Sequence, residues 1–174
     1  MPGPIDPADD FDFITDRLAI GSVASRATPG FVAVVSILSG SPFDERYKAP
    51  PIPTHWTDQE GVLRGVRTFH ISLGDGEPGL EHRLDKVMEF ISDELKYGCV
   101  LVHCGAGLSR SVAVVAAYLC RFAGMRLDEA IAFIKARRQG ACPADIFIAA
   151  ITRWMRLDRL SHSGPRLDKR GSMG

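Results

Sequence analysis

The chain has 174 residues, which is the length of one ordinary domain and is enough to bury a substantial core. Hydrophobic residues make up 45% of it and charged residues 24%, the proportions of a globular protein. Its 21 basic side chains balance 21 acidic ones, so no net field draws it toward nucleic acid or anionic lipid. We therefore expect neither a nucleic-acid nor a membrane partner, and any anion site must be built from a few placed groups.

The start of the chain and its cysteines indicate a compartment. Residues 1–10 are acidic and proline-rich, unlike a signal peptide, and no apolar stretch approaches the ~20 residues that span a bilayer. No CxxC pair and no Cys/His metal spacing occurs among the four cysteines, which are Cys99, Cys104, Cys120 and Cys142. We expect a reduced, cytoplasmic, monomeric protein that needs no metal or cofactor.

Short apolar runs alternate with helical patterns along the chain, which is typical of an α/β domain with a layered core. Strands are predicted at Ile14–Ile20, Val32–Leu38, Thr68–Leu73 and Cys99–His103. The second and fourth of these runs are almost entirely apolar, as in strands that are covered on both faces. We place one domain at residues 11–160, with flexible ends at 1–10 and 161–174.

Four helices follow from the 3.6-residue spacing of apolar side chains: one from Leu80 to Leu95, then Ser111–Phe122, Asp128–Arg138 and roughly Asp145–Leu160. Ser111–Phe122 is apolar nearly all round, which predicts a buried central helix. We expect the basic residues Lys135–Arg138 to form a solvated helix end. The long connection Ser39–Val66 is polar and proline-rich, and such connections are usually functional or disordered.

The segment VLVHCGAGLSRS, Val100 to Ser111, joins a buried strand to the buried helix. Its glycines permit the φ values with which successive backbone N–H groups turn inward to form an anion nest. The N-terminus of the following helix adds its positive end. The loop is therefore predicted to cradle a phosphate through Gly105, Ala106, Gly107, Leu108, Ser109 and Arg110.

The side chains of this loop suggest nucleophilic chemistry. The nest would stabilise the thiolate of Cys104 and lower its pKa. Arg110 carries a planar fork that grips two phosphate oxygens at once. Ser111 is placed to hydrogen-bond the sulfur, and His103 is expected to orient the loop. Our hypothesis is that Cys104 takes up a phosphoryl group, whereas the other three cysteines are expected to be core residues.

HCGAGLSRS resembles the HCxxGxxR[S/T] signature of the protein tyrosine phosphatase superfamily, and its SRS ending is similar to that of the dual-specificity branch. The resemblance extends from about Phe13 to Leu157. It implies a central, twisted, mostly parallel sheet flanked by helices, with the phosphate-binding loop between a central strand and a helix. It also implies hydrolysis through a cysteinyl-phosphate intermediate without a metal.

The family resemblance further implies a general acid about thirty residues before the cysteine. Asp75 lies 29 residues before Cys104 in the segment LGDGEPG, whose glycines leave the loop room to close over a substrate. We assign Asp75 as the acid, with Asp58 as the fallback and Glu77 as a weaker alternative.

One segment departs from the family pattern. Many dual-specificity enzymes carry Pro-Asn after the third helix, whereas this chain has Pro143-Ala144, so the contribution of that asparagine is either absent here or supplied by Asp145 or Gln139.

The substrate stays open among several classes. Residues 105–109 contain no basic side chain, which favours phosphoproteins over phosphoinositides or RNA 5′-triphosphates. We expect phosphotyrosine as a substrate and leave phosphoserine and phosphothreonine open. The alternatives are a phosphoinositide or RNA 5′-triphosphate phosphatase, a non-catalytic phosphate-binding module and, with a poorer fit, a sulfurtransferase.

Overall fold

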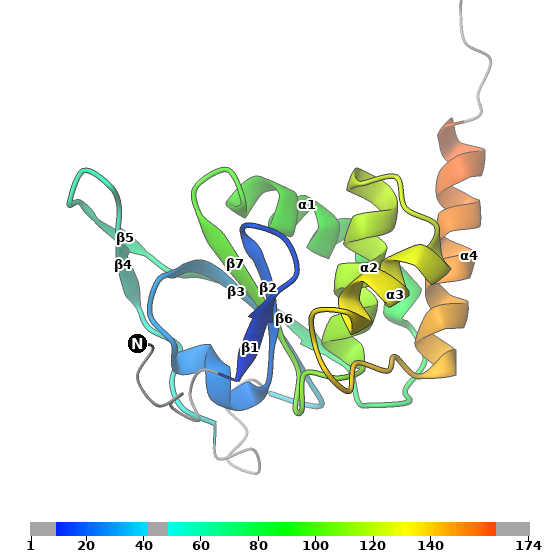
Figure 1. The fold of residues 1–174 in the computed structure, drawn as a ribbon, viewed down its shortest axis with the longest axis horizontal. Coiled ribbons are helices and arrows are strands. Elements are labelled where there is room, and N and C mark those ends of the chain that lie inside the picture. Colours follow the sequence, from blue (N-terminus) through cyan, green and yellow to red (C-terminus); the bar gives the residue numbers. More distant parts are fainter. Residues whose placement is uncertain (1–9, 42–48, 163–174) are drawn as a thin grey trace, which may run out of the picture.

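A five-stranded sheet forms the centre of the computed structural model, which describes residues 10–41 and 49–162 (Figure 1). Its order is β1 (Phe11–Phe13), β2 (Leu18–Gly21), β7 (Cys99–His103), β3 (Phe31–Leu38) and β6 (Arg67–Ser72). Only β1 is antiparallel to its neighbour, and the other pairs are parallel. The predicted mostly parallel sheet is confirmed. The predicted flexible ends lie almost entirely in residues 1–9 and 163–174, outside the described residues.

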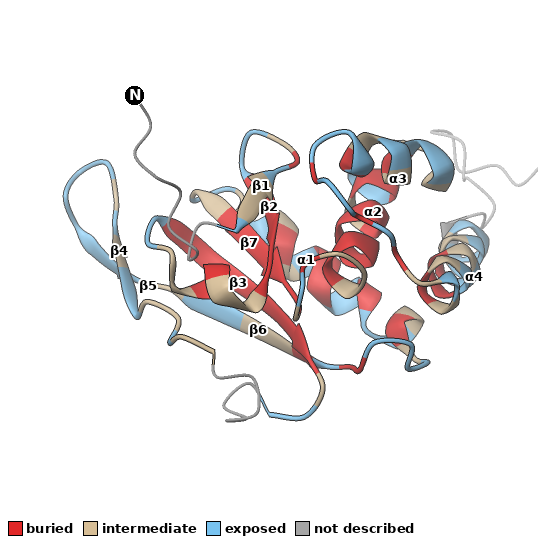
Figure 2. Ribbon diagram, turned by 60° about the horizontal axis from the view of Figure 1, so that its bottom comes forward, coloured by how far each residue is buried: buried red, intermediate tan, exposed pale blue. Residues whose placement is uncertain are grey.

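The α-helices cover one face of this sheet (Figure 1). The larger core lies between the helices and this face. They are α1 (Leu84–Glu94), α2 (Arg110–Phe122), α3 (Leu127–Lys135) and α4 (Asp145–His162), with short 3-10 helices at Val23–Ala27 (η2) and Leu80–His82 (η4). Residues 111–117 of α2 are all buried, as Figure 2 shows, so the predicted central helix is confirmed. Within the described ranges, no helix is both long and apolar enough to cross a membrane.

The other face of the sheet carries a smaller apolar cluster around Val34 and Leu101. Ile52 and Val66, from the long connection after β3, pack against it. The connection also contains a hairpin, β4 (His55–Thr57) paired with β5 (Leu63–Gly65), which sequence patterns did not predict. Part of the connection therefore serves as the cover of the second sheet face.

Two predicted boundaries were wrong for local reasons. The run Ile14–Ile20 is not one strand, because the N–H groups of Ile14 and Leu18 bond within a tight turn, to the Leu18 carbonyl and the Thr15 hydroxyl. The first long helix begins at Leu84 rather than Leu80, because Gly79 has a φ of 106° and a 3-10 turn follows it.

Candidate active site

Cys104 directly follows β7, at the carboxyl edge of the sheet and between two parallel neighbours, where such sheets bind ligands. The residue is 2% exposed, and its Sγ lies 3.2 Å from the hydroxyl of Ser111 in the first turn of α2. Burial raises the pKa of the thiol, but hydrogen bonds from Ser111, the Arg110 charge and the Ser109 N–H outweigh it, so the Cys104 pKa is lowered. The site therefore favours a thiolate.

The loop after Cys104 turns four successive carbonyls outward onto donors from elsewhere in the chain. Gly105 accepts from the Val23 N–H (2.9 Å), Ala106 and Gly107 from the Arg138 guanidinium (3.3 and 2.7 Å), and Leu108 from the Cys142 N–H (2.7 Å). Because C=O and N–H point in opposite directions across a trans peptide, the N–H groups of residues 106–109 are directed inward. The predicted anion nest is thus present in the backbone.

Gly107 cannot be exchanged for another residue in this loop. Its φ is 70°, and an added Cβ would lie 2.4 Å from the Gly21 carbonyl oxygen and 2.7 Å from the Arg138 guanidinium. Both the conformation and the close approach of β2 require glycine.

Arg110 closes the nest from the start of α2. One guanidinium nitrogen donates to the Leu73 carbonyl at 3.0 Å, and another lies 3.3 Å from the point where a Cβ on Gly105 would sit. Its Nε is buried and has no partner among the described residues. A buried guanidinium N–H that lacks an acceptor among the described residues, on a side chain beside the cysteine loop, fits a phosphate oxygen.

The three candidates for the general acid differ in the hydrogen bonds that their carboxylates accept. Asp58 accepts from the Val62 N–H (2.7 Å) and the Arg64 guanidinium (2.9 Å), and these bonds hold the pKa of Asp58 below its usual range. Glu77 accepts from the Gly74 N–H at 2.8 Å. Asp75 is exposed and has no hydrogen bond within the described part of the chain. It follows Leu73, which Arg110 ties to the nest.

A family model of known proteins matches the part of the chain that contains the cysteine loop. The family model described as "Dual specificity phosphatase, catalytic domain" matches residues 56–156, which is more than half of the chain and includes the cysteine loop. The chain belongs to the dual specificity phosphatases. The predicted branch and the predicted fold class are thereby confirmed, and the members of this family are cysteine-dependent protein phosphatases.

Relatives and solved structures agree with this placement. The chain is 37% identical over 143 residues to dual specificity protein phosphatase 1B of Arabidopsis thaliana, covering 82% of this chain and 80% of that protein. It is 38% identical over 89 residues to mouse dual specificity protein phosphatase 8, covering 48% of this chain but only 13% of the relative's length. The fold resembles human DUSP28, with a TM-score of 0.71, 22% identity and coverage of 91% and 99% of the two chains.

Arg138 is a residue of this phosphatase that sequence reasoning misjudged. It was expected at a solvated helix end, and Lys135 and Arg137 are indeed exposed, but Arg138 is 4% exposed. Besides the two loop carbonyls, it binds the carboxylates of Asp10 (3.1 Å) and Asp12 (2.9 Å) at the start of the chain. It therefore joins β1, the cysteine loop and the segment after α3. No sequence signal separates it from its exposed neighbours.

The departure at Pro143-Ala144 contacts the loop through its backbone. The Ala144 N–H donates to the Ser109 hydroxyl at 3.0 Å. Gln139 and Asp145, which we considered as replacements for the family's asparagine, are both exposed.

His103 is fully buried, and desolvation lowers its pKa to about 4, so it is neutral at physiological pH. Its Nδ1 lies 3.3 Å from the Cys104 carbonyl oxygen. This contact is consistent with the predicted orienting role.

The remaining three cysteines differ in how far they are buried. Cys120 is buried, and desolvation raises its pKa to about 11, as expected for a core thiol. Cys99 is half-buried at the far end of β7 from Cys104. The expectation of a core position is wrong for Cys142, which is exposed because it follows the tight turn at Gly140.

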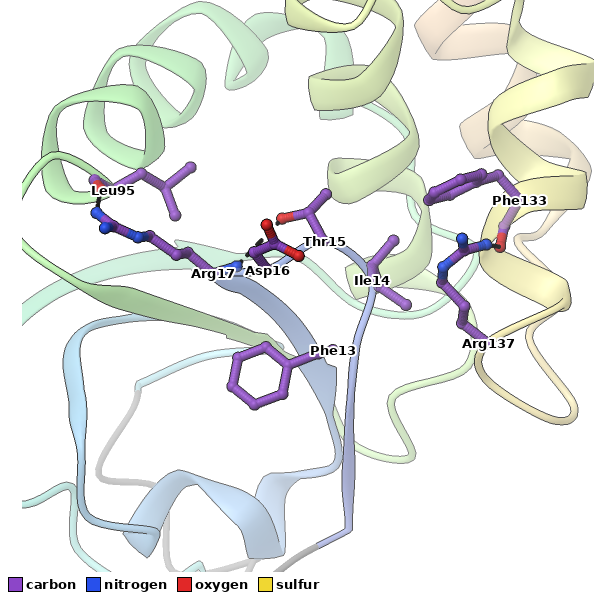
Figure 3. Close-up of a pocket in the computed structure, with 8 residues that line it drawn as sticks. All are labelled: Phe13, Ile14, Thr15, Asp16, Arg17, Leu95, Phe133 and Arg137. Atoms are coloured by element: carbon purple, nitrogen blue, oxygen red, sulfur yellow. Dashed lines mark hydrogen bonds between the residues drawn. The ribbon is translucent and has the colours of Figure 1, made fainter.

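A pocket of about 860 Å³ lies away from this site (Figure 3). The turn between β1 and β2 lines it, together with Leu95, Phe133 and Arg137. Since the Val100 N–H binds the Arg17 carbonyl in this turn, the pocket lies at the amino end of β7, whereas Cys104 follows its carboxyl end. Among the residues that the structure describes, no three His, Cys, Asp or Glu side chains gather as metal ligands would.

Proposed function

We propose that this chain hydrolyses phosphotyrosine in proteins through a cysteinyl-phosphate intermediate on Cys104. One observation carries the proposal: a thiol with a lowered pKa begins a loop whose carbonyls bond outward, and the buried Nε of Arg110 at the end of this loop has no partner among the described residues. Such a site holds three phosphate oxygens and places sulfur opposite the leaving oxygen. Family membership makes phosphatase chemistry the natural use of this geometry.

In the first step the Cys104 thiolate attacks phosphorus, an S–P bond forms, and the P–O bond to the tyrosyl oxygen breaks. Asp75 gives its proton to that oxygen, so the product leaves as a phenol. The inward N–H groups and Arg110 stabilise the charge on the three phosphoryl oxygens as it redistributes.

In the second step water attacks phosphorus and the S–P bond breaks. The Asp75 carboxylate takes the proton of the water and thereby returns to its acid form. The sulfur leaves as a thiolate, and the Ser111 hydroxyl 3.2 Å away stabilises it by donating a hydrogen bond. Inorganic phosphate is the second product.

The charges around the nest favour a substrate with a single phosphate. Arg138 is already paired with two carboxylates, and the Arg26 guanidinium donates to the Pro50 carbonyl at 2.6 Å. Within the described residues, Arg110 is thus the cation that the loop itself offers to a ligand. A phosphoinositide or an RNA 5′-triphosphate brings several charges that would have to be balanced elsewhere.

A side-by-side assay tests the proposal with phosphotyrosine and phosphothreonine peptides, a phosphoinositide and an RNA 5′-triphosphate, each with and without excess EDTA. We expect the highest kcat/KM on the phosphotyrosine peptide and no loss of activity with EDTA. Preference for the lipid or the triphosphate would overturn the substrate class. Binding of phosphopeptide without turnover would make the chain a non-catalytic module, and a requirement for metal would refute the mechanism.

A further inference from the structure

Three buried polar atoms on neighbouring strands lack a hydrogen-bond partner among the described residues. They are Ser36 Oγ on β3, His103 Nε2 on β7 and His70 Nδ1 on β6. The strand register pairs Ser36 with His103 on one side and with His70 on the other. Because adjacent parallel strands lie about 4.8 Å apart, the three side chains form one lateral row, the His–Ser–His row.

The row continues the second face of the sheet toward the catalytic edge. Val34 and Leu101, two residues before Ser36 and His103, belong to the smaller apolar cluster on that face, and side chains two apart in a strand share a face. Ser36 is 2% exposed and His103 is 0% exposed, so these two polar side chains are shielded from solvent next to Cys104. Buried polar groups of this kind normally have partners, and the strand register places these three residues side by side.

The proton positions in the row follow from its outer contacts. A carbonyl oxygen only accepts, so the His103 Nδ1 that lies 3.3 Å from the Cys104 carbonyl carries a hydrogen. His103 is neutral, since its pKa is lowered to about 4, and its Nε2 is therefore an acceptor. His70 Nε2 likewise carries a hydrogen, because it lies 2.8 Å from the Gly40 carbonyl. His70 Nδ1 becomes a donor only when the ring takes up a second proton.

We propose that Ser36 and His70 are positioning residues for His103 and, through it, for the nucleophile loop. The Ser36 hydroxyl donates to His103 Nε2, directly or through a bridging water, and protonated His70 donates to the Ser36 oxygen. This fixes the His103 ring so that its Nδ1–H holds the Cys104 carbonyl at the entry to the nest. The proposal rests on the function proposed above for Cys104.

The row has a built-in dependence on pH. Ser36 has one hydroxyl hydrogen, which cannot serve two acceptor nitrogens, so neutral His70 and neutral His103 compete for it. The row is complete when His70 is protonated. The other charged groups that face His103 are Arg26 from η2 and Arg110 from α2.

Substitutions of Ser36 test the hydrogen bond to His103. Ser36→Ala removes the donor, Ser36→Thr retains the hydroxyl, and Thr68→Ala is the control, an exposed position on β6 two residues before His70. Two readouts need no substrate: the ring-nitrogen NMR shifts of His103 and the pH midpoint for alkylation of Cys104 by iodoacetamide. We expect Ser36→Ala to move the Nε2 resonance, raise the alkylation midpoint and lower kcat about 3- to 10-fold. Ser36→Thr should stay within about 2-fold of the wild type.

His70→Gln tests the proton that completes the row. The variant should have a lower kcat than wild type at those pH values where the wild-type His70 ring carries a second proton, and match it where the ring is neutral, with the ring-nitrogen NMR shifts of His70 reporting that protonation across the same pH series. An unchanged His103 Nε2 resonance in Ser36→Ala, or a His70→Gln defect of equal size at all pH values, would overturn the proposal. If the wild type lacks phosphatase activity but Ser36→Ala still moves the Nε2 resonance, the function fails and the hydrogen bond stands.

Discussion

The two loops that meet at the active site are held in opposite ways. The nucleophile loop, residues 104–110, has four consecutive carbonyls fixed by donors from η2, Arg138 and the segment after α3. The acid loop, residues 73–79, bonds mainly within itself, through Gly74 and Glu77. Arg110 ties its first residue to the nest.

This difference matches the tasks that we assign to the loops. Stabilising a transition-state charge requires donors that are already in place and need no reorganisation. A general acid has to admit the substrate first and then approach the leaving oxygen, which suits an exposed loop with glycines in left-handed conformations, Gly76 and Gly79. We therefore expect the nucleophile loop to hold the phosphate in a fixed geometry and the acid loop to move as the substrate enters.

The largest expected effect comes from the fixed loop. Cys104→Ser should abolish turnover, because a neutral serine hydroxyl is a much weaker nucleophile than a cysteine thiolate. The thermal unfolding temperature should stay close to that of the wild type. Steady-state assays on a phosphotyrosine peptide check this, with Cys142→Ser, an exposed thiol, as the matched control. Activity retained in Cys104→Ser would remove the nucleophile from the account.

The acid loop should give the next largest effect. Asp75→Ala should lower kcat about 10²- to 10⁴-fold on phenyl phosphate, and less on a substrate whose leaving group needs little protonation. The basic limb of the pH–rate profile should disappear, since it reports the acid losing its proton, and the acidic limb from Cys104 should remain.

An equal loss on every leaving group, with both limbs kept, would make Asp75 structural. Asp58→Ala is then the next variant, although the bonds of Asp58 to Val62 and Arg64 suit a role in the β4–β5 turn.

Removing a hydrogen-bond donor that holds the nucleophile loop should lower kcat less than removing the nucleophile itself. Arg138→Met leaves the Ala106 and Gly107 carbonyls without their donor, and we expect kcat to fall about 10-fold as the nest loses its order. Arg137→Met removes an exposed charge one residue earlier and should leave kcat unchanged. Equal kcat values for the two variants would show that the loop needs no such support.

The last of these predictions concerns the pH dependence of stability rather than activity. Between pH 6.5 and about 4, His103 binds a proton in the unfolded chain but not in the folded one, because burial lowers its folded pKa to about 4. The free energy of unfolding should therefore fall as the pH drops through this range, by about 3 kcal/mol in total. In denaturant titrations, the free energy of unfolding of His103→Gln should depend less on pH than that of the wild type. The control His55→Gln, at an exposed site, should keep the wild-type dependence. A dependence unchanged in His103→Gln would contradict this.

The sequence predicted those parts of the site that are contiguous. The strand, nest and helix from Cys99 to Phe122 were predicted to within a residue, because glycine spacing and apolar runs act over short distances. Arg138 could not be recognised, because its acceptors lie 31 and 126 residues away and only the tertiary fold brings them together. A role for Ser36 and His70 beside the cysteine loop could not be predicted for the same reason, because the strand register determines their neighbours.

The β4–β5 hairpin was missed for a different reason. Its strands have three residues each and are mostly exposed, so they lack the alternation of apolar and polar residues that marks a strand. Its turn depends instead on the Asp58 carboxylate and on Gly61 with a φ of 79°.

Trapping the intermediate tests the central claim most directly. Asp75→Ala enzyme is mixed with a ³²P-labelled phosphotyrosine peptide, quenched in acid within one turnover, digested and mapped by mass spectrometry. We predict label and an 80-dalton adduct on the peptide that contains Cys104, attached through sulfur and released by iodine. Label on another residue, or steady-state turnover with no labelled enzyme at any time point, would contradict the account.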